Sequence, residues 1–436
     1  MSYHLFEVVG IELEYMVVRS ADLKVNPIVD KLLTKKNGSL TSDVENGKIE
    51  WSNELVAHVV ELKTNGPTSD VDNLDALFAD NVREINELLQ EFGSQLLPTA
   101  SHPLMDPKME MKLWEHHYNR IYALYNKIFD CHGHGWSNVQ SMHINLPFSS
   151  DEEFERLHAA IRLLLPIIPG LCASSPIFEG KFTGYKDSRM QVYRDNQKEI
   201  PEMTGKVIPE RVFSRKDYTT QIFEPINTAI RPYDTENILD QHFLNSRGAI
   251  ARFDRGAIEI RVIDIQECPK ADIAIAVLIV ESLKLLVSEE LISLKDQKIW
   301  HEDALFSILD EVNRDAETTR IVNPTYLDAF DLEKEARVKD IWKKLFSKVK
   351  GAMSKAHCES IKFILENGSL STRILEAVGN DYSQENINSV YRRLGSCLVR
   401  RGRKRCAPRD VTRGGSSEDR RDEGQPSQRP HTEESL

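Results

Sequence analysis

The sequence predicts an α+β fold, with a β-sheet in the first part of the chain and a helical region after it. Segments that alternate polar and aliphatic residues, a pattern typical of strands, lie at 4–18, 59–64, 139–147 and 256–264. Beyond residue 270, apolar residues recur at helical spacing up to about residue 395. These two observations favour a sheet covered by helices.

Composition narrows the class of protein. With 436 residues, 40% of them hydrophobic and 28% charged, the chain has the profile of a soluble globular protein that can bury a sizeable core. It has no apolar run long enough to cross a bilayer and no secretory signal, so we expect a cytoplasmic protein without membrane contact. A net charge of -12 argues against broad nucleic-acid binding and fits a protein that gathers carboxylates around divalent cations. Six cysteines without a CxxC pair argue against a disulfide framework or a structural zinc site.

The first predicted strand, 4–18, carries two acidic residues on one face. Glu12 and Glu14 are two residues apart and therefore share a face, while the residues between them point to the other side. Two neighbouring carboxylates repel each other, and a strand that keeps both usually has a cation beside them. The alternative is a solvated strand face.

A second acidic pair lies at Glu54 and Glu61. Seven residues apart, the two would point to opposite faces of one unbroken strand, so a shared site requires a bend or bulge between them, near His58. The next segment, 70–97, is predicted to be one amphipathic helix that packs on the core.

The middle of the chain adds a histidine and a basic loop. In the strand at 139–147, His143 and Asn145 share a face. Helices are expected at 110–130 and 151–171, and the segment Cys131-His132-Gly133-His134 between them is expected to be a loop rather than a metal site. The Gly-containing basic segment that ends at Arg189 is able to approach phosphate or carboxylate oxygens closely, and 190–245 is expected to be irregular with strand-like pieces.

The last predicted strand, 256–264, pairs an acid with a base. Glu259 and Arg261 share one face, which suits a site that holds a cation and an anionic oxygen together, although a surface ion pair is the simpler explanation. A long apolar helix over 271–294 and further helices at 304–312, 332–349 and 358–366 follow. From Arg400 the chain is rich in charge and poor in aliphatics, so we expect a globular domain over 1–398 and a disordered polar tail over 399–436.

The polar strand positions form one chemical set. They are Glu12, Glu14, Glu54, Glu61, His143, Glu259 and Arg261. Such a set is too large for one general acid and base and too rich in oxygen for structural zinc, but it suits about two or three Mg²⁺ or Mn²⁺ ions bridged by phosphates. Because no Walker-type or kinase-type glycine loop is present, we expect a nucleotide site on an open sheet face.

Five short motifs occur in an order that resembles the glutamate-cysteine ligase type 2 family, also called carboxylate-amine ligases. They are Gly10-Ile11-Glu12-Leu13-Glu14, the Glu54 to Glu61 spacing that ends in Val-Glu-Leu-Lys-Thr, Met142-His143-Ile144-Asn145, Ala173-Ser174-Ser175-Pro176 and Ile258-Glu259-Ile260-Arg261. The resemblance covers residues 4–270 and implies a glutamine-synthetase-like fold. In that fold a curved, mainly antiparallel sheet forms an active-site funnel and is backed by helices.

The resemblance also implies the chemistry. Glu12, Glu14, Glu54, Glu61, His143 and Glu259 would be metal ligands for Mg²⁺ or Mn²⁺, Glu259 and Arg261 would act in catalysis with Arg261 on the ATP phosphates, and Arg189 and Asn145 are candidate substrate contacts. The family transfers the γ-phosphoryl group of ATP to a carboxylate, and an amine then attacks the acyl phosphate.

The substrates that the resemblance favours are glutamate and cysteine, giving γ-glutamylcysteine for glutathione biosynthesis, in a protein that could form a homo-oligomer. The alternatives are a ligase for another amine or acid, a non-catalytic nucleotide- or metal-binding homologue, and a metal-dependent hydrolase.

Overall fold

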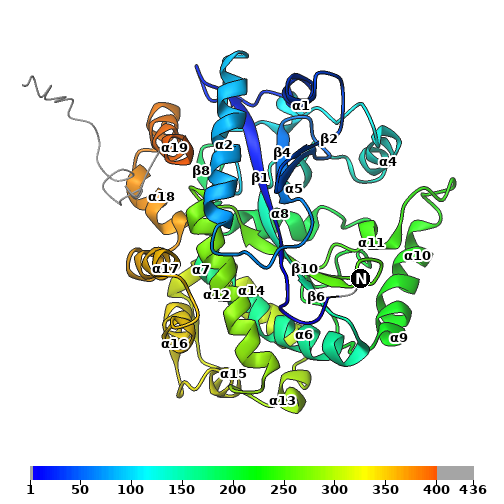
Figure 1. The fold of residues 1–436 in the computed structure, drawn as a ribbon, viewed down its shortest axis with the longest axis vertical. Helices are drawn as coiled ribbons and strands as arrows, with labels where there is room; N and C mark the ends of the chain where they lie inside the picture. Colours follow the sequence, from blue (N-terminus) through cyan, green and yellow to red (C-terminus); the bar gives the residue numbers. More distant parts are fainter. Residues whose placement is uncertain (1–2, 400–436) are drawn as a thin grey trace, which may run out of the picture.

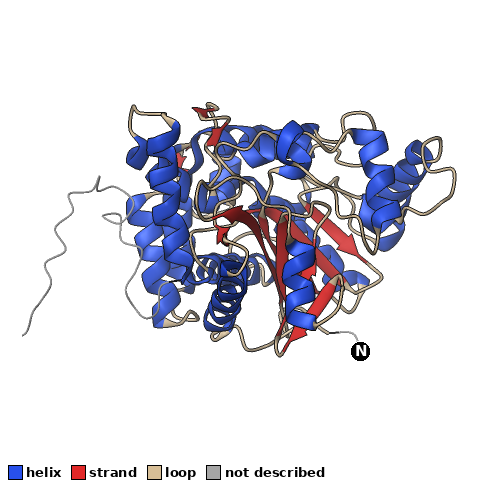
Figure 2. Ribbon diagram, turned by 90° about the horizontal axis from the view of Figure 1, so that it is seen from above, coloured by secondary structure: helices blue, strands red, loops and turns tan. Residues whose placement is uncertain are grey.

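The computed structural model describes residues 3–399 and has one large antiparallel sheet at its centre. The strand order is β2-β3-β4-β1-β6-β10-β9, and β5 pairs with β1 beyond this path. The strands of this sheet are β1 (Gly10–Arg19), β2 (Asp43–Asn46), β3 (Ile49–Asn53), β4 (Val59–Thr64), β5 (Ser94–Leu97), β6 (Ser141–Pro147), β9 (Ala249–Arg252) and β10 (Ala257–Asp264). The predicted α+β class with a mainly antiparallel sheet is confirmed, and Figure 2 shows the strands in the middle of the molecule with helices on either side.

Strand β1 is long and central because both of its edges are paired. It pairs with β4 along one edge and with β6 and then β5 along the other, so most of its backbone amides and carbonyls are paired within the sheet. Leu13 and Tyr15 are fully buried, and Ile11 lines a pocket together with Ile273 of α12 (Pro269–Val287). The aliphatic face of β1 therefore points into the helical layer, which leaves the face of Glu12 and Glu14 for the site.

The helical layer behind the sheet is organised around α12, which is apolar on nearly all sides. This helix packs against α2 (Leu74–Gln90), α6 (Asp151–Leu164), α16 (Val338–Val349) and α17 (Lys355–Asn367), so almost every face is covered (Figure 1). Pro269 stands in its first turn, where the missing N–H costs nothing.

The remaining elements complete the cover and the rim. The helices are α1 (Val29–Asn37), α3 (Pro107–Glu110), α4 (Asn119–Phe129), α5 (His134–Ser137), α7 (Pro169–Cys172), α8 (Ser188–Asp195), α9 (Arg215–Tyr218), α10 (Glu224–Ile230), α11 (Gln241–Leu244), α13 (Leu294–Lys298), α14 (Glu302–Asp315), α15 (Pro324–Asp328), α18 (Leu370–Val378) and α19 (Gln384–Val399). Two small hairpins pair β7 (Ile177–Phe178) with β8 (Lys181–Phe182) and β11 (Arg320–Ile321) with β12 (Ala336–Arg337).

Two sequence predictions about secondary structure are wrong, the second of them in part. The single helix expected over 70–97 ends at Gln90, because Gly93 takes a left-handed φ of 62° and the chain turns into β5. The region 190–245 is irregular over 196–214 and 231–240, as expected, but in place of the expected strand-like pieces it holds α9, a π-helix over Thr219–Phe223, α10 and α11. These helices have four to seven residues, too few for a hydrophobic period to be visible in the sequence.

The boundaries of the other predicted elements shift by several residues. The first strand begins at Gly10 rather than at residue 4, and the helix expected over 110–130 occupies only 119–129. The predicted tail of 399–436 lies outside the described residues except for Val399, which ends α19. No helix within residues 3–399 is long and apolar enough to span a membrane.

Candidate functional site

A cavity of about 560 Å³ lies on the polar face of the sheet and crosses it from β3 and β4 to β10 and β9. Residues of the sequence-predicted set line it together: Glu12, Glu14, Glu54, Glu61, His143, Arg189, Glu259 and Arg261. Asn145, the remaining candidate, does not line the cavity. Residues up to 249 positions apart in the chain are thus neighbours, because three antiparallel strands pair in register.

The strand register explains how the side chains meet. On the two edges of β1, Glu12 stands opposite His143 of β6, and Glu14 stands opposite Glu61 of β4. On the next strand pair, Glu259 of β10 stands opposite Asn145 of β6. Residues directly opposite each other on neighbouring strands point to the same face and have side chains in contact range.

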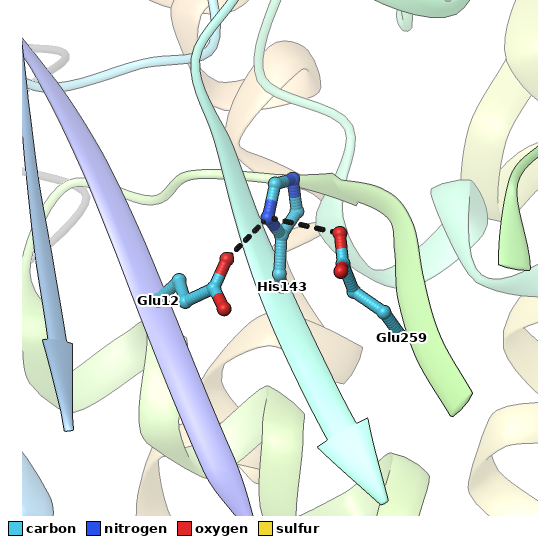
Figure 3. A group of neighbouring side chains, drawn as sticks. All are labelled: Glu12, His143 and Glu259. Atoms are coloured by element: carbon cyan, nitrogen blue, oxygen red, sulfur yellow. Dashed lines mark hydrogen bonds and ion pairs between the residues drawn. The ribbon is translucent and has the colours of Figure 1, made fainter. Parts of the chain in front are cut away.

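The first group of potential metal ligands is Glu12, His143 and Glu259 (Figure 3). The Nδ1 atom of His143 lies 2.8 Å from Oε2 of Glu12 and 3.7 Å from Oε1 of Glu259. Asn145 donates from Nδ2 to Oε1 of Glu12 at 3.0 Å, which fixes the rotation of that carboxylate. One ligand atom from each residue of the group lies within 4.8 Å of the others.

The second group shares the same histidine and consists of Glu14, Glu61 and His143. The backbone N–H and the hydroxyl of Ser141 both donate to Oε2 of Glu14, at 2.7 and 3.0 Å. On the far side, Ser52 donates to Oε2 of Glu61 at 2.8 Å, and Lys63 Nζ lies 3.3 Å from the same oxygen. Each carboxylate is therefore held by a neighbour of its own before any ligand arrives.

The electrostatics of the two groups indicate an excess of negative charge. Burial and then the charge of Glu12 raise the pKa of Glu61 to about 7, and burial and then Glu61 raise that of Glu54 well above its usual value. Burial would also raise the pKa of Glu12, but the hydrogen bond and charge of His143 lower it to about 2. Burial lowers the pKa of His143, and its two carboxylate neighbours more than reverse this, to about 9.

The pKa shifts and the ligand atoms of the two groups fit a divalent cation. Within the apoprotein the protonated imidazole is the positive charge that lies between the carboxylates, and a metal ion would take over that role while His143 gave up its proton. The ligand atoms are mostly carboxylate oxygens, which favours Mg²⁺ or Mn²⁺ over zinc.

Glu54 reaches the cavity by a different route from the one predicted. It lies just after β3, and residues 54–58 connect β3 to its antiparallel neighbour β4, which carries Glu61. The two residues therefore face one cavity because the chain reverses between them, and not because one strand bulges at His58. His58 is fully buried and bonds through Nε2 to the carbonyl of Ser137 at 2.8 Å. Glu54 is not part of either group of ligand atoms.

Arg261 lies at an irregularity in β10. The pairing of β10 with β6 shifts by one residue between Ile260 and Ile263, a bulge that re-aims side chains locally. The Nε atom of Arg261 lies 3.3 Å from Oε1 of Glu259, and Arg252 approaches the other oxygen of Glu259 to 3.6 Å. The end of the cavity at β9 and β10 is therefore basic, whereas the end at β3 and β4 is mainly acidic.

Arg189 is almost fully buried, and its Nε and Nη2 atoms are already engaged within the protein. Its Nε lies 2.5 Å from Oδ1 of Asp264, and Nη2 donates to the backbone carbonyl of Arg261 at 3.2 Å. Asp264 also accepts from the backbone of Ser174 and the hydroxyl of Ser175, at 2.8 and 2.9 Å. Arg189 thus ties α8 to the bulge of β10, and it stands on a helix rather than in the loop expected from the sequence.

The sequence did not point to the wall of the cavity formed by α8. Arg189, Tyr193 and Asn196 line the cavity at spacings of four and three residues, as one face of a helix does. The side chain of Asp187 caps this helix by accepting from the N–H of Met190 at 2.9 Å. That capping residue, followed by the i, i+4, i+7 spacing, is the signal that could have revealed the wall.

A sheet with a carboxylate-lined cavity on one face and helices on the other is the arrangement expected of a carboxylate-amine ligase fold. The chain belongs to glutamate-cysteine ligase family 2, whose model matches residues 8–393. A relative from Archaeoglobus fulgidus, described as an uncharacterized protein, is 33% identical over 374 residues, which are 86% of this chain and 94% of that one. A putative glutamate-cysteine ligase 2 from Cronobacter sakazakii is 23% identical over 184 residues, 42% of this chain and 46% of the relative.

Solved structures agree on the fold. The glutamate-cysteine ligase of Francisella tularensis in complex with AMP aligns over 92% of this chain and 90% of its own, with a TM-score of 0.59 and 15% identity. A bifunctional glutathione synthetase from Pasteurella multocida aligns over 90% of this chain and 53% of its own, with a TM-score of 0.56 and 12% identity.

Proposed function

We propose that this protein is an ATP- and Mg²⁺-dependent ligase that joins the γ-carboxylate of glutamate to the amine of cysteine. The observation that carries the proposal is the pair of carboxylate groups that share His143, with Arg261 beside Glu259 at the basic end. Membership of the family supports a ligase reaction. The AMP bound to the glutamate-cysteine ligase of Francisella tularensis supports a nucleotide as a substrate.

The side chains that line the cavity would bind the cations and the phosphates of ATP. Glu12 and Glu259 would hold one cation, and Glu14 and Glu61 another, with Glu54 completing the second from the β3 side. The neutral ring of His143 would be a ligand of one of the two, because it offers a single lone pair. When bound, Mg²⁺ offsets the charge of the phosphates so that a carboxylate can approach them. Arg261 would donate to the transferring phosphoryl group, because its guanidinium lines the cavity and stays charged.

The remaining side chains orient these groups. Asn145 and Ser141 hold the carboxylates of Glu12 and Glu14 in one rotamer each, so ligand geometry is fixed before ATP binds. The substrate carboxylate would take the γ-phosphoryl group and release ADP. The amine would then attack the carbonyl carbon, and phosphate would leave. No protein nucleophile is required, and the proposal assigns none.

The direct test is ADP release by the full chain with ATP, Mg²⁺ and glutamate, with and without cysteine, while mass spectrometry follows the dehydrated adduct. ADP together with γ-glutamylcysteine is the expected result. Glutamate-dependent ADP without that adduct would keep the ligase and point to another amine. No ADP with a panel of acids and amines, despite ATP binding, would reject the ligase in favour of a binding protein, and amide cleavage without ATP would indicate a hydrolase.

A further inference from the structure

The wall that α8 contributes to the cavity carries two polar atoms that the fold leaves unsatisfied. Among the described residues, the hydroxyl of Tyr193 and the Oδ1 atom of Asn196 are buried and have no hydrogen-bond partner. Both residues line the cavity. A buried polar atom without a partner costs on the order of 1–3 kcal/mol, so two of them on one wall call for an explanation.

The two atoms differ in what they can bind. The amide of Asn196 is oriented by its own Nδ2 group, which donates to the carbonyl of Gly135 at 2.9 Å. Its Oδ1 is therefore the free end and can only accept a hydrogen bond. The phenol of Tyr193 can donate, and it stands on the side of α8 that also carries Arg189, which holds the carbonyl of Arg261.

The two residues stand on the same face of the wall. Tyr193 and Asn196 are one helical turn apart, and the backbone of Asn196 remains helical, with φ -69° and ψ -20°. Side chains three residues apart on a helix are neighbours, about 5–6 Å between their Cβ atoms. The two side chains therefore share one face of the cavity wall, and an acceptor and a donor on one face suit the ammonium and the carboxylate of a single α-carbon.

We propose that Tyr193 and Asn196 recognise the α-carboxylate and the α-ammonium of the acid substrate and so select an α-amino acid over a plain dicarboxylate. The inference rests on the proposed function and deepens it. We assign these contacts to the acid substrate and not to the amine, because α8 is joined to Arg261 through Arg189. In the proposed reaction the acid places its reacting carboxylate beside Arg261, which contacts the phosphoryl group. Tyr193 and Asn196 are specificity-determining residues in this assignment.

The test uses the full chain and three acids: L-glutamate, glutarate, which lacks the ammonium, and 4-aminobutyrate, which lacks the α-carboxylate. Binding is measured by calorimetry with Mg²⁺ and a non-hydrolysable ATP analogue, and turnover by ADP release. Asn196→Ala should weaken glutamate roughly tenfold to a hundredfold and leave glutarate unchanged, whereas Asn196→Asp, which retains an acceptor, should restore the preference. Tyr193→Phe should weaken glutamate by a similar factor and leave 4-aminobutyrate unchanged.

A matched control removes another hydroxyl from the same cavity. The hydroxyl of Tyr125 lies 3.5 Å from the carbonyl of Phe243 and so has a partner in the protein, and Tyr125→Phe should not change the ratio of glutamate to either analogue. If the Tyr193 and Asn196 variants lost affinity equally for all three acids, the inference would be overturned, because a merely structural role predicts equal losses of affinity. A changed preference for cysteine over cysteamine, with glutamate unaffected, would also overturn it.

The two proposals fail differently. Selective glutamate binding that depends on Tyr193 and Asn196, without ADP release, would support the inference and reject the ligase reaction. ADP release with unaltered preferences in the variants would support the reaction and reject the inference. Absence of binding by all three acids would reject the inference as well.

Discussion

At the scale of single residues, His143 is the group on which the site depends. Its two ring nitrogens face opposite sides, Nδ1 towards Glu12 and Glu259 and Nε2 towards Glu14. The hydroxyl of Ser141 lies 2.9 Å from Nε2, which adds a polar contact on the Glu14 side. One imidazole thus joins both groups of potential ligands, and no carboxylate of the described site touches all the others.

Replacing Glu259 by Gln removes one proposed metal ligand and the ion-pair partner of both Arg261 and Arg252. The amide retains nearly the same volume, so folding should survive, while the rate of ADP release should fall about a hundredfold or more. The measurement is steady-state ADP release at saturating ATP and glutamate. Glu45→Gln, on the exposed face of β2, is the matched control, and an unchanged rate in Glu259→Gln would contradict the assigned role.

A second prediction at this scale concerns stability against pH. His102 is buried, its Nδ1 accepts from the N–H of Leu104 at 3.1 Å and its Nε2 donates to the carbonyl of Leu23 at 2.7 Å, so the fold requires the neutral ring. Burial lowers its pKa from 6.5 to about 4. The unfolded chain therefore binds the proton first as pH falls, and the stability due to His102 is complete above pH 6.5 and disappears towards pH 4.

The expected contribution is about 3 kcal/mol, from the difference between 6.5 and 4 at 1.36 kcal/mol per unit. Urea unfolding between pH 7.5 and 4 measures it, and His102→Asn should flatten the loss in that window. His132→Asn, at a half-exposed histidine, should leave the slope as it is. A wild-type slope retained by His102→Asn would show that other groups cause the acid sensitivity.

At the scale of elements, the position of α8 decides what the cavity can bind. The helix begins at its Asp187 cap, is tied to β10 by Arg189 and Asp264, and lies against α5. That last contact depends on Gly135, where a Cβ would stand 2.6 Å from the carbonyl oxygen of Val192 and 2.7 Å from Cβ of Asn196. The close approach of α5 and α8 therefore requires a residue without a side chain at this point.

Gly135→Ala should force the two helices apart. Overpacking of this kind typically costs about 1–3 kcal/mol, and the shift should also weaken glutamate binding, because Asn196 rests on the carbonyl of Gly135. Urea unfolding and calorimetry of glutamate measure both effects. Gly351→Ala is the control, since nothing lies within 4 Å of a Cβ there. Equal stability of the two variants would mean that the helices adjust without strain.

At the scale of the whole molecule, the cavity is polarised across the sheet. Glu50, Glu54 and Glu61 line it at the β3 and β4 end, whereas Arg252, Arg255 and Arg261 line it at the β9 and β10 end. Only the order of strands in the sheet produces this separation, since the chain visits the acidic end first and returns to the basic end some 190 residues later.

A divalent cation should therefore stabilise the folded protein as a whole. If Mg²⁺ binds only the native state, a free concentration of about a hundred times its Kd raises the free energy of unfolding by about 2.7 kcal/mol. We expect this to appear as a rise in Tm of a few degrees. Differential scanning calorimetry with MgCl₂, against NaCl at equal ionic strength, measures it, and a chelator should reverse the shift. The joint variant Glu14→Gln/Glu259→Gln should lose it, and an equal Tm in both salts would speak against metal binding in the cavity.

The sequence by itself determined four strands of the sheet, β1, β4, β6 and β10, the face on which Glu12, Glu14, His143 and Glu259 stand, and the apolar α12 that covers the opposite face. These follow from local periodicity, because alternation along a strand fixes which side chains share a face. The tertiary structure alone decided that Glu54 reaches the cavity from a strand connection, that Arg189 is held by Asp264, and that Tyr193 and Asn196 form a wall. These features depend on which distant strands pair and on where helices dock, and local periodicity does not specify either of these.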